Sequence, residues 1–273
     1  ICGSEFRGNR AQNGGGAIYL VTHWYQGNRF IIDQSLFSDN RSLSTSEGQG
    51  GAIFTMDDNK HTKPSAPDAS QTKITNTLFV DNATRKSGGG LWFWTEEGQL
   101  TLTNVTFAQN SVAKENKTSM GGALALSRGP ALIVNCTFAD NYARFHGGGI
   151  QMSGEAQVTM QNSLFHNNLS NRDGGWANFH SNRAVDVDSG GNIQWLDADK
   201  VIDSNSNKPV SENARVVDPL LETLSDNGGP TRTMALQAGS PAINAGVKAG
   251  APTTDQRGEP RDDSPDVGAF EAQ

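Results

Sequence analysis

One two-part motif recurs six times along the 273-residue chain and limits what the chain can fold into. The first part is Phe-x-x-Asn, and the second is a Gly pair or triplet followed by a short apolar run. Successive Phe residues of the motif are 31, 42, 28, 31 and 27 positions apart. A unit of about 30 residues cannot bury its own apolar face, so such units must stack on one another. The Phe-x-x-Asn pairs are Phe6/Asn9, Phe37/Asn40, Phe79/Asn82, Phe107/Asn110, Phe138/Asn141 and Phe165/Asn168.

The residues after each Gly corner alternate with the period of a β-strand. Leu91/Phe93 and Leu124/Leu126 are apolar at every second position, which is typical of a strand with one buried face. This pattern excludes helical repeats, and the Asn-Gly or Asp-Gly turns of propeller blades do not recur in each unit. The sequence therefore predicts an all-β fold of the pectin-lyase-like type. It is a right-handed parallel β-helix, a solenoid in which equivalent residues of successive coils lie about 4.8 Å apart.

The composition agrees with this prediction. The chain has 31 Gly and 24 Asn, and both residue types are poor helix formers. Gly at a coil corner supplies a positive φ, and Asn residues of successive coils can hydrogen-bond in ladders. The formal net charge of −7 argues against a nucleic-acid partner. The sequence also contains no apolar run near the ~20 residues of a membrane span.

Two regions are predicted. Residues 1–214 form the coils, regular to about residue 180 and irregular after it, and the Pro-containing residues 215–273 form a looped C-terminal cap packed on the β-helix. Polar insertions at 57–71 and 113–120 interrupt the repeats, and long solenoid loops are common binding sites. Because Phe6 already belongs to a repeat, the first coil is expected to have an open sheet edge. Upstream residues are expected to cover this edge, and a protein partner docked there is the alternative.

Two family resemblances follow from these residues. The pairing of Phe-x-x-Asn with Gly-Gly-Ala-Ile resembles the repeats of chlamydial polymorphic membrane proteins and related bacterial surface β-helices. The tail resembles the choice-of-anchor Q region of secreted bacterial β-helix proteins, which implies an extracellular or cell-surface location in a bacterium and no particular reaction. The tail segments that carry this resemblance are 218–221, 226–231, 239–246, 254–261 and 266–271.

The first three coils carry an aromatic column. If Ile18 and Leu20 point inward, Tyr19 points outward, and the equivalent residues of the next coils are Phe54 and Trp92. Exposed aromatic residues on a flat sheet are a plausible platform for sugar rings. The alternative is that loops 22–29 and 57–71 cover this face, and a facing assignment wrong by one residue would reverse the conclusion. The candidate ligand-binding residues of this face are Tyr19, Phe54, Trp92, Trp94 and the loop residue Trp24.

A second candidate is basic. Arg85 and Arg144 both stand six residues after a motif Phe, and they are predicted to lie in one row on an edge of the β-helix. Such a row could bind acidic sugars, and a solvated row without function is the alternative. Catalytic residues cannot be assigned, because no nucleophile elbow, phosphate loop or paired-carboxylate motif is recognisable.

Metal and disulfide chemistry are weakly indicated. The five His residues lack the spacing of a metal site, and no cofactor is expected. Asp39, Asp81 and Asp140 precede the motif Asn, and a structural Ca²⁺ bound to their row is weighed against solvated carboxylates. Cys2 and Cys136 should stand about four coils, ~19 Å, apart, which is too far for a disulfide.

The leading hypothesis is a secreted or cell-surface adhesion scaffold. It would bind a polysaccharide, the cell envelope or another protein through a sheet face and its loops. Two alternatives stay open: a polysaccharide lyase or glycoside hydrolase, and a structural surface or filament subunit.

Overall fold

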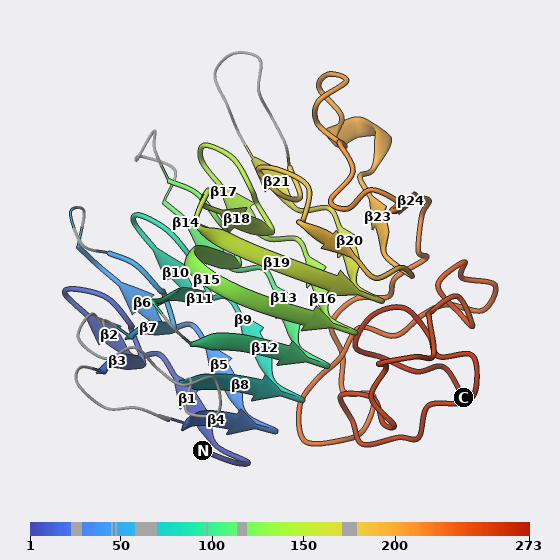
Figure 1. Cartoon of the computed structure of the whole chain (residues 1–273), viewed down its shortest axis with the longest axis horizontal. Helices are drawn as coiled ribbons and strands as arrows, with labels where there is room; N and C mark the ends of the chain where they lie inside the picture. The colour runs from blue at the N-terminus through green and yellow to red at the C-terminus, as the bar shows by residue number, and fades with distance from the viewer. Residues whose placement is uncertain are drawn as a thin grey trace.

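The computed structural model describes residues 1–22, 29–44, 46, 48–57, 70–96, 98–113, 119–170 and 179–273. Within these residues the strands pair in parallel with their equivalents one coil away, and the coils stack along one axis (Figure 1). The predicted parallel β-helix is confirmed. No helix in the described ranges has the length and apolar character to cross a membrane.

Three sheets run along the solenoid. The first, the Phe sheet, contains β1 (Glu5–Arg7), β5 (Leu36–Ser38), β9 (Leu78–Val80), β13 (Thr106–Ala108), β16 (Thr137–Ala139), β20 (Leu164–His166), β23 (Ile193–Trp195) and β24 (Arg215–Val216). The second, the short sheet, contains β2 (Arg10–Ala11), β6 (Arg41–Ser42), β10 (Ala83–Thr84), β14 (Ser111–Val112), β17 (Tyr142–Ala143) and β21 (Leu169–Ser170).

The third sheet has two branches that the long strand β15 (Leu124–Val134) joins. The first branch adds β3 (Ile18–Thr22), β7 (Ile53–Asp57), β11 (Leu91–Thr95) and β18 (Ile150–Met152). The second branch adds β4 (Arg29–Asp33), β8 (Gln71–Thr75), β12 (Gln99–Thr103), β19 (Ala156–Gln161) and β22 (Val187–Asp188). A short 3₁₀ turn, η2 (Ala198–Lys200), lies in the irregular region that follows.

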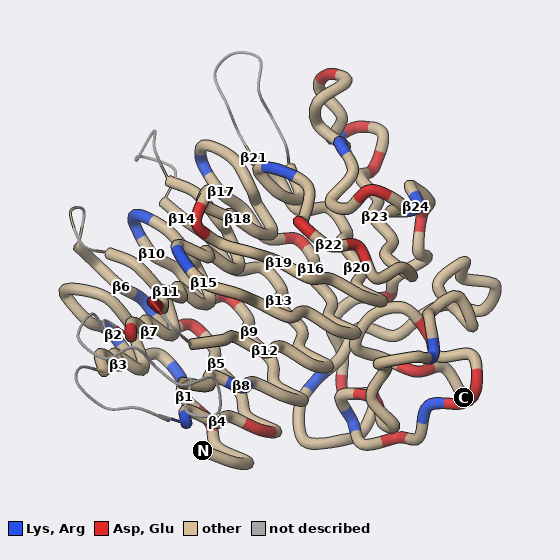
Figure 2. The backbone as a smooth tube through the Cα atoms, viewed as in Figure 1, with Lys and Arg blue, Asp and Glu red and all other residues tan. Residues whose placement is uncertain are grey.

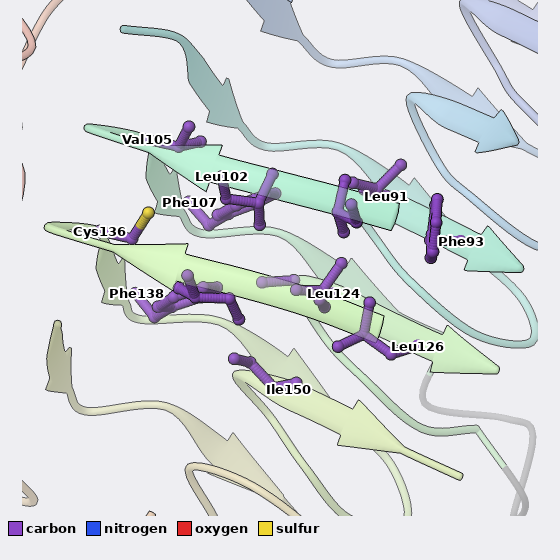
Figure 3. Close-up of a cluster of buried hydrophobic side chains, with 14 of the residues drawn as sticks. Leu91, Phe93, Leu102, Val105, Phe107, Leu124, Leu126, Cys136, Phe138 and Ile150 are labelled. Atoms are coloured by element: carbon purple, nitrogen blue, oxygen red, sulfur yellow. The ribbon is translucent and has the colours of Figure 1, made fainter. Parts of the chain in front are cut away.

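The motif Phe residues form the centre of the core. Their rings stack in register along the Phe sheet, with centroids 4.7 to 5.1 Å apart. From Phe37 to Phe165 each ring is fully buried. Leu91, Leu102 and Leu124 from the facing sheet fill the space beside the rings (Figure 3). One Phe in each repeat therefore builds a continuous apolar column, which is why the units are stable only as a stack.

The motif Asn residues form a hydrogen-bonded ladder. Asn82 Nδ2 donates to Asn110 Oδ1 at 2.9 Å and to the carbonyl oxygen of Phe37 at 2.9 Å. Asn110 Oδ1 also accepts the backbone N–H of Asn82, so each inner side chain has all its hydrogen-bonding groups satisfied although it is buried. The ladder runs through Asn9, Asn40, Asn82, Asn110, Asn141 and Asn168.

The corners need residues that tolerate positive φ. Asn76, Asn104, Asn135 and Asn162 have φ between 49° and 53° at the corner before the Phe sheet, and Asn is among the residues that enter this region at low cost. At the Gly corner, Gly88 has φ +71°, and a Cβ on Gly89 would collide with the carbonyl oxygen of Gly122 in the next coil. The predicted use of the Gly and Asn excess at corners is confirmed.

The C-terminal residues 217–273, called the flank segment below, lie along the outer side of the Phe sheet (Figure 1). Met234 packs on Leu36 and Leu78 of the early coils, whereas Leu236, Ala242 and Val267 pack on Leu164 and Ile193 of the later ones. The segment therefore covers the side of the solenoid over much of its length.

Polar contacts fasten the flank segment to the coils. Asn104 Nδ2 donates to the Thr254 carbonyl oxygen at 2.8 Å, and Thr106 Oγ1 donates to Gln256 Oε1 at 2.6 Å. Within the segment, Arg261 and Glu271 form an ion pair at 2.6 Å with side chains only 1% and 3% exposed. Figure 2 shows several other charged residues on this segment.

Both cysteines are free, with Cys2 exposed and Cys136 buried. Burial raises the pKa of the Cys136 thiol to about 12, so this thiol is unreactive at neutral pH.

Candidate functional site

The outer face of the first branch carries two rows of large side chains. In the first row Tyr19 pairs with Phe54 and Phe54 with Trp92, after which Ala125 and Gln151 follow. The second row contains Val21, Met56 and Trp94. The predicted facing is correct, because Ile53 and Leu91 lie in the main core while Phe54 and Trp92 form a separate cluster. The six residues Tyr19, Val21, Phe54, Met56, Trp92 and Trp94 are called the outer aromatic face below.

The three rings of the first row stack on one another. Tyr19 and Phe54 have centroids 4.6 Å apart with planes 3° from parallel, and Phe54 and Trp92 are 4.5 Å apart at 8°. Tyr19 is 58% exposed, whereas Phe54 and Trp92 are each only 6% exposed. The expectation of three exposed rings is therefore corrected.

Ring stacking between coils accounts for part of this burial, because residues of successive coils lie close enough for their rings to face one another. Loops 22–29 and 57–71, the expected alternative cover for this face, fall largely outside the described residues. The Phe54 ring also packs on the preceding corner, where a Cβ on Gly14 would be 2.8 Å from the ring. The inner rings Phe54 and Trp92 therefore offer no open face on which a sugar ring could stack.

Trp94 has a neighbour that the sequence pattern did not predict. The pairing of β11 with β15 shifts between Phe93 and Trp94, so that Arg128 rather than Ser127 lies opposite Trp94. The Arg128 guanidinium is 6.0 Å from the centre of the Trp94 ring, at the outer limit of a cation–π contact. The sequence signal for this bulge is Gly129-Pro130, because both residue types interrupt strand pairing.

Two carboxylates flank the same guanidinium. Arg128 pairs with Glu96 at 2.8 Å and with Glu155 at 3.1 Å, and all three side chains are partly exposed. The cluster therefore holds one positive and two negative charges beside the outer aromatic face. It supplies hydrogen-bonding groups for a ligand on this face.

Arg85 and Arg144 lie in one row, as predicted, but they do not belong to adjacent coils. Arg85 and Arg144 follow β10 and β17, and the register of the short sheet places Ala113 between them. The two Arg residues are therefore two coils apart in one row. Arg85 lines a shallow pocket of ≈270 Å³ with Arg41.

The other residues predicted to form sites have different outcomes. Trp24 lies outside the described residues. Asp39 pairs with Arg10 at 3.0 Å and with Arg41 at 2.8 Å, and the hydrogen bond from Arg10 is the main cause that lowers the pKa of Asp39. Burial instead raises the pKa values of Asp81 and Asp140. In the part of the chain that the structure describes, no three His, Cys, Asp or Glu residues are grouped as a metal site would need.

Comparison with protein-family models matches residues 3–20 and 34–56 to the Chlamydia polymorphic membrane protein repeat. Each matched segment contains one Phe-x-x-Asn pair and the Gly run that follows it. No curated protein matches the chain. The likeness of the tail to a choice-of-anchor region stays a prediction. The predicted resemblance is confirmed by this match: the first coils of this solenoid are similar to the repeat of the Chlamydia polymorphic membrane proteins.

Proposed function

We propose that the protein is a surface-exposed β-helix protein that binds a polysaccharide chain or another cell-surface component across the outer aromatic face. The family name of the matched repeat supports a location at an outer membrane or cell surface. The solenoid serves as a rigid scaffold, and the binding contacts come from residues that depart from the repeat.

The observation that carries this proposal is the side chain of Trp94, which is only partly buried and lies 6.0 Å from the Arg128 guanidinium. A partly exposed aromatic ring offers apolar area to the C–H face of a sugar or to an apolar side chain of a partner. By contrast, the flank segment covers the Phe sheet on its outer side.

The stack also prepares the site for binding. The Tyr19 ring is held by Phe54, and Phe54 by Trp92, so Tyr19 loses little side-chain entropy when a ligand binds. Arg128, Glu96 and Glu155 lie beside the same face and provide partners for hydroxyl groups. Apolar contact at Trp94 and polar contact at this cluster together would fix the orientation of a chain-like ligand.

A glycan array with Tyr19→Ala, Trp94→Ala and Gln151→Ala variants tests the proposal. Gln151 occupies the same outward row as Tyr19 in a later coil, so Gln151→Ala is the matched control. We expect Tyr19→Ala and Trp94→Ala to lower affinity by about tenfold or more, as loss of an aromatic anchor does, and Gln151→Ala to leave it unchanged. Equal affinity of all three variants for the bound glycan would refute the role of this face.

An assay for reducing ends and for unsaturated sugar products on the same glycans addresses the enzyme alternative. Turnover that depends on Glu96 or Glu155 would replace the binding proposal with a polysaccharide-cleaving activity. Binding without turnover agrees with a scaffold.

A further inference from the structure

An unpaired carboxylate lies inside the solenoid. Asp57 is the last residue of β7 and is 7% exposed, and among the described residues neither of its carboxylate oxygens has a hydrogen-bond partner. Buried charges are normally paired, because transfer of a bare carboxylate out of water is costly. The buried Glu271, for comparison, accepts from the Arg261 side chain and from the backbone N–H groups of Asp262 and Asp266. Asp57 is therefore a buried carboxylate without a partner in the part of the chain that the structure describes.

The Asp57 side chain lines a partly open pocket of ≈190 Å³ at one corner of the coils. The pocket lies between the ends of β3, β7 and β11 and the starts of β4, β8 and β12, where the two branches of the third sheet are still separate strands. In the next coil the branches merge into β15, and a Cβ on Gly129 would collide with the Thr95 side chain. Close packing of β15 on Thr95 therefore closes the pocket on that side.

The middle coil makes this pocket polar. Thr55 pairs with Leu20 of the coil before and Phe93 of the coil after, and Thr72 pairs with Phe30 and Leu100 in the same way. Two positions that are apolar in both neighbouring coils thus carry hydroxyl groups in the coil of Asp57. The pocket combines the negative charge of Asp57, the positive charge of the exposed Arg29, several hydroxyl oxygens and the rings of Phe30 and Phe93.

We propose that this pocket binds a small organic ammonium ion. The cationic head would pair with Asp57, and its remaining N–H groups would donate to the hydroxyl groups of Thr55 and Thr72. The alkyl part would contact Phe30 and Phe93, whose ring faces also attract a cation. The site lies on the inner side of the first branch and is independent of the binding proposed for the outer aromatic face.

Other ligands fit these observations less well. Ca²⁺ takes six to eight oxygen ligands, usually with several carboxylates, and the lining residues supply one. A neutral sugar would leave the charge of Asp57 uncompensated. The volume is below the ~300 Å³ at which pockets for drug-sized molecules begin, so the occupant is small.

Isothermal titration calorimetry on the whole chain, with propylammonium chloride as the probe, tests the proposal. The neutral probe 1-propanol and the metal probe CaCl₂, each at matched ionic strength, separate charge from shape and from metal binding. We expect saturable binding of propylammonium only. Asp57→Asn keeps the size of the side chain and removes its charge, and it should weaken binding by about tenfold or more. Asp199→Asn, which changes an exposed carboxylate in η2, is the control and should bind as the parent chain does.

Three results would overturn the proposal: unchanged binding to Asp57→Asn, equal binding of 1-propanol, or Asp57-dependent binding of Ca²⁺ in place of the ammonium ion. The lining also includes Arg29, which is exposed and is the other charged residue among those lining residues. If Arg29 were the partner of Asp57, Arg29→Ala and Asp57→Asn would destabilise the ligand-free protein equally, and the double variant would add nothing. That pattern would also overturn the proposal.

Discussion

The coils and the flank segment solve the same problem of buried polar groups in opposite ways. In the coils Asn110 is paired with Asn82 and Asn141, so each partner is the same residue of a neighbouring repeat. In the flank segment Arg261 pairs with Glu271, and its guanidinium also donates to Asn104 and to the Gly268 carbonyl oxygen. A repeated partner needs only a repeated sequence, whereas a unique partner needs one particular tertiary contact. The two regions should therefore respond differently to single substitutions.

The largest effect is expected at the buried ion pair. Arg261→Ala leaves Glu271 charged and without its main partner, and we expect a loss of about 3–5 kcal/mol in the free energy of unfolding. Urea denaturation measures it. Lys248→Ala is the control, because the pair of Lys248 with Asp263 is exposed, so solvent screens it and its loss should have little effect on the free energy of unfolding. Similar losses in the two variants would show that burial does not distinguish these pairs.

A smaller effect is expected within the Asn ladder. Asn110→Ala removes the side-chain oxygen that accepts from the backbone N–H and from Nδ2 of Asn82, and each unsatisfied buried group costs about 1–3 kcal/mol. Asn9 is exposed at the first rung, so Asn9→Ala should cost less than half as much. The same urea series measures both. Equal costs at the two rungs would contradict the view that the ladder stabilises by satisfying buried groups.

The pH dependence of stability should differ between the coils and the flank segment. His180 ends the ladder, with its Nδ1 3.4 Å from Asn168 Nδ2 and its Nε2 3.1 Å from Asn207 Oδ1. Burial lowers the pKa of His180 to about 3, from 6.5 in the unfolded chain. Between these values the unfolded chain binds more protons. The contribution of His180 to stability is therefore complete above pH 6.5 and falls by up to about 1.4 kcal/mol per pH unit toward pH 3.

In the flank segment the pH dependence of stability has the opposite sign. Burial raises the pKa values of Asp266 and Glu271, so acidification removes a penalty on their charged forms and favours the folded state. The His180→Gln variant removes only the histidine term. We expect the parent chain to lose more stability than His180→Gln between pH 7 and pH 5, measured by urea midpoints. Parallel profiles would mean that His180 does not control the acid response.

The smallest effect is expected at the bulge. Arg128 makes two partly exposed ion pairs and a distant contact with Trp94, so Arg128→Ala should change stability by about 1 kcal/mol or less. A thermal melt checks this, and the quenching of tryptophan fluorescence reports whether Trp94 becomes more accessible. A loss as large as that of Arg261→Ala would place the bulge among the structural contacts of the coils.

Much of the fold could be predicted because the repeat places each residue type in one column. The Phe column, the Asn ladder and the Gly corners follow from spacing alone. The outer aromatic face was predicted with the right direction and the wrong exposure, because period two distinguishes the two sides of a strand and says nothing about what covers either side. Arg128 was missed because one bulge residue changes the register, and a strict repeat does not contain that residue.

Asp57 shows the limit most clearly. From the sequence it is the first residue of a polar insertion, and only the register of β7 with β3 and β11 places it inside the solenoid. The path of the flank segment was likewise undetermined, because its partners Leu36, Leu78 and Leu164 occupy outward positions that any apolar segment could cover. The sequence by itself determined the solenoid, since local spacing and nearest-neighbour stacking suffice for a repeat. The tertiary structure decided the flank, the bulge and the pocket at Asp57, because each depends on contacts that occur once and leave no period in the sequence.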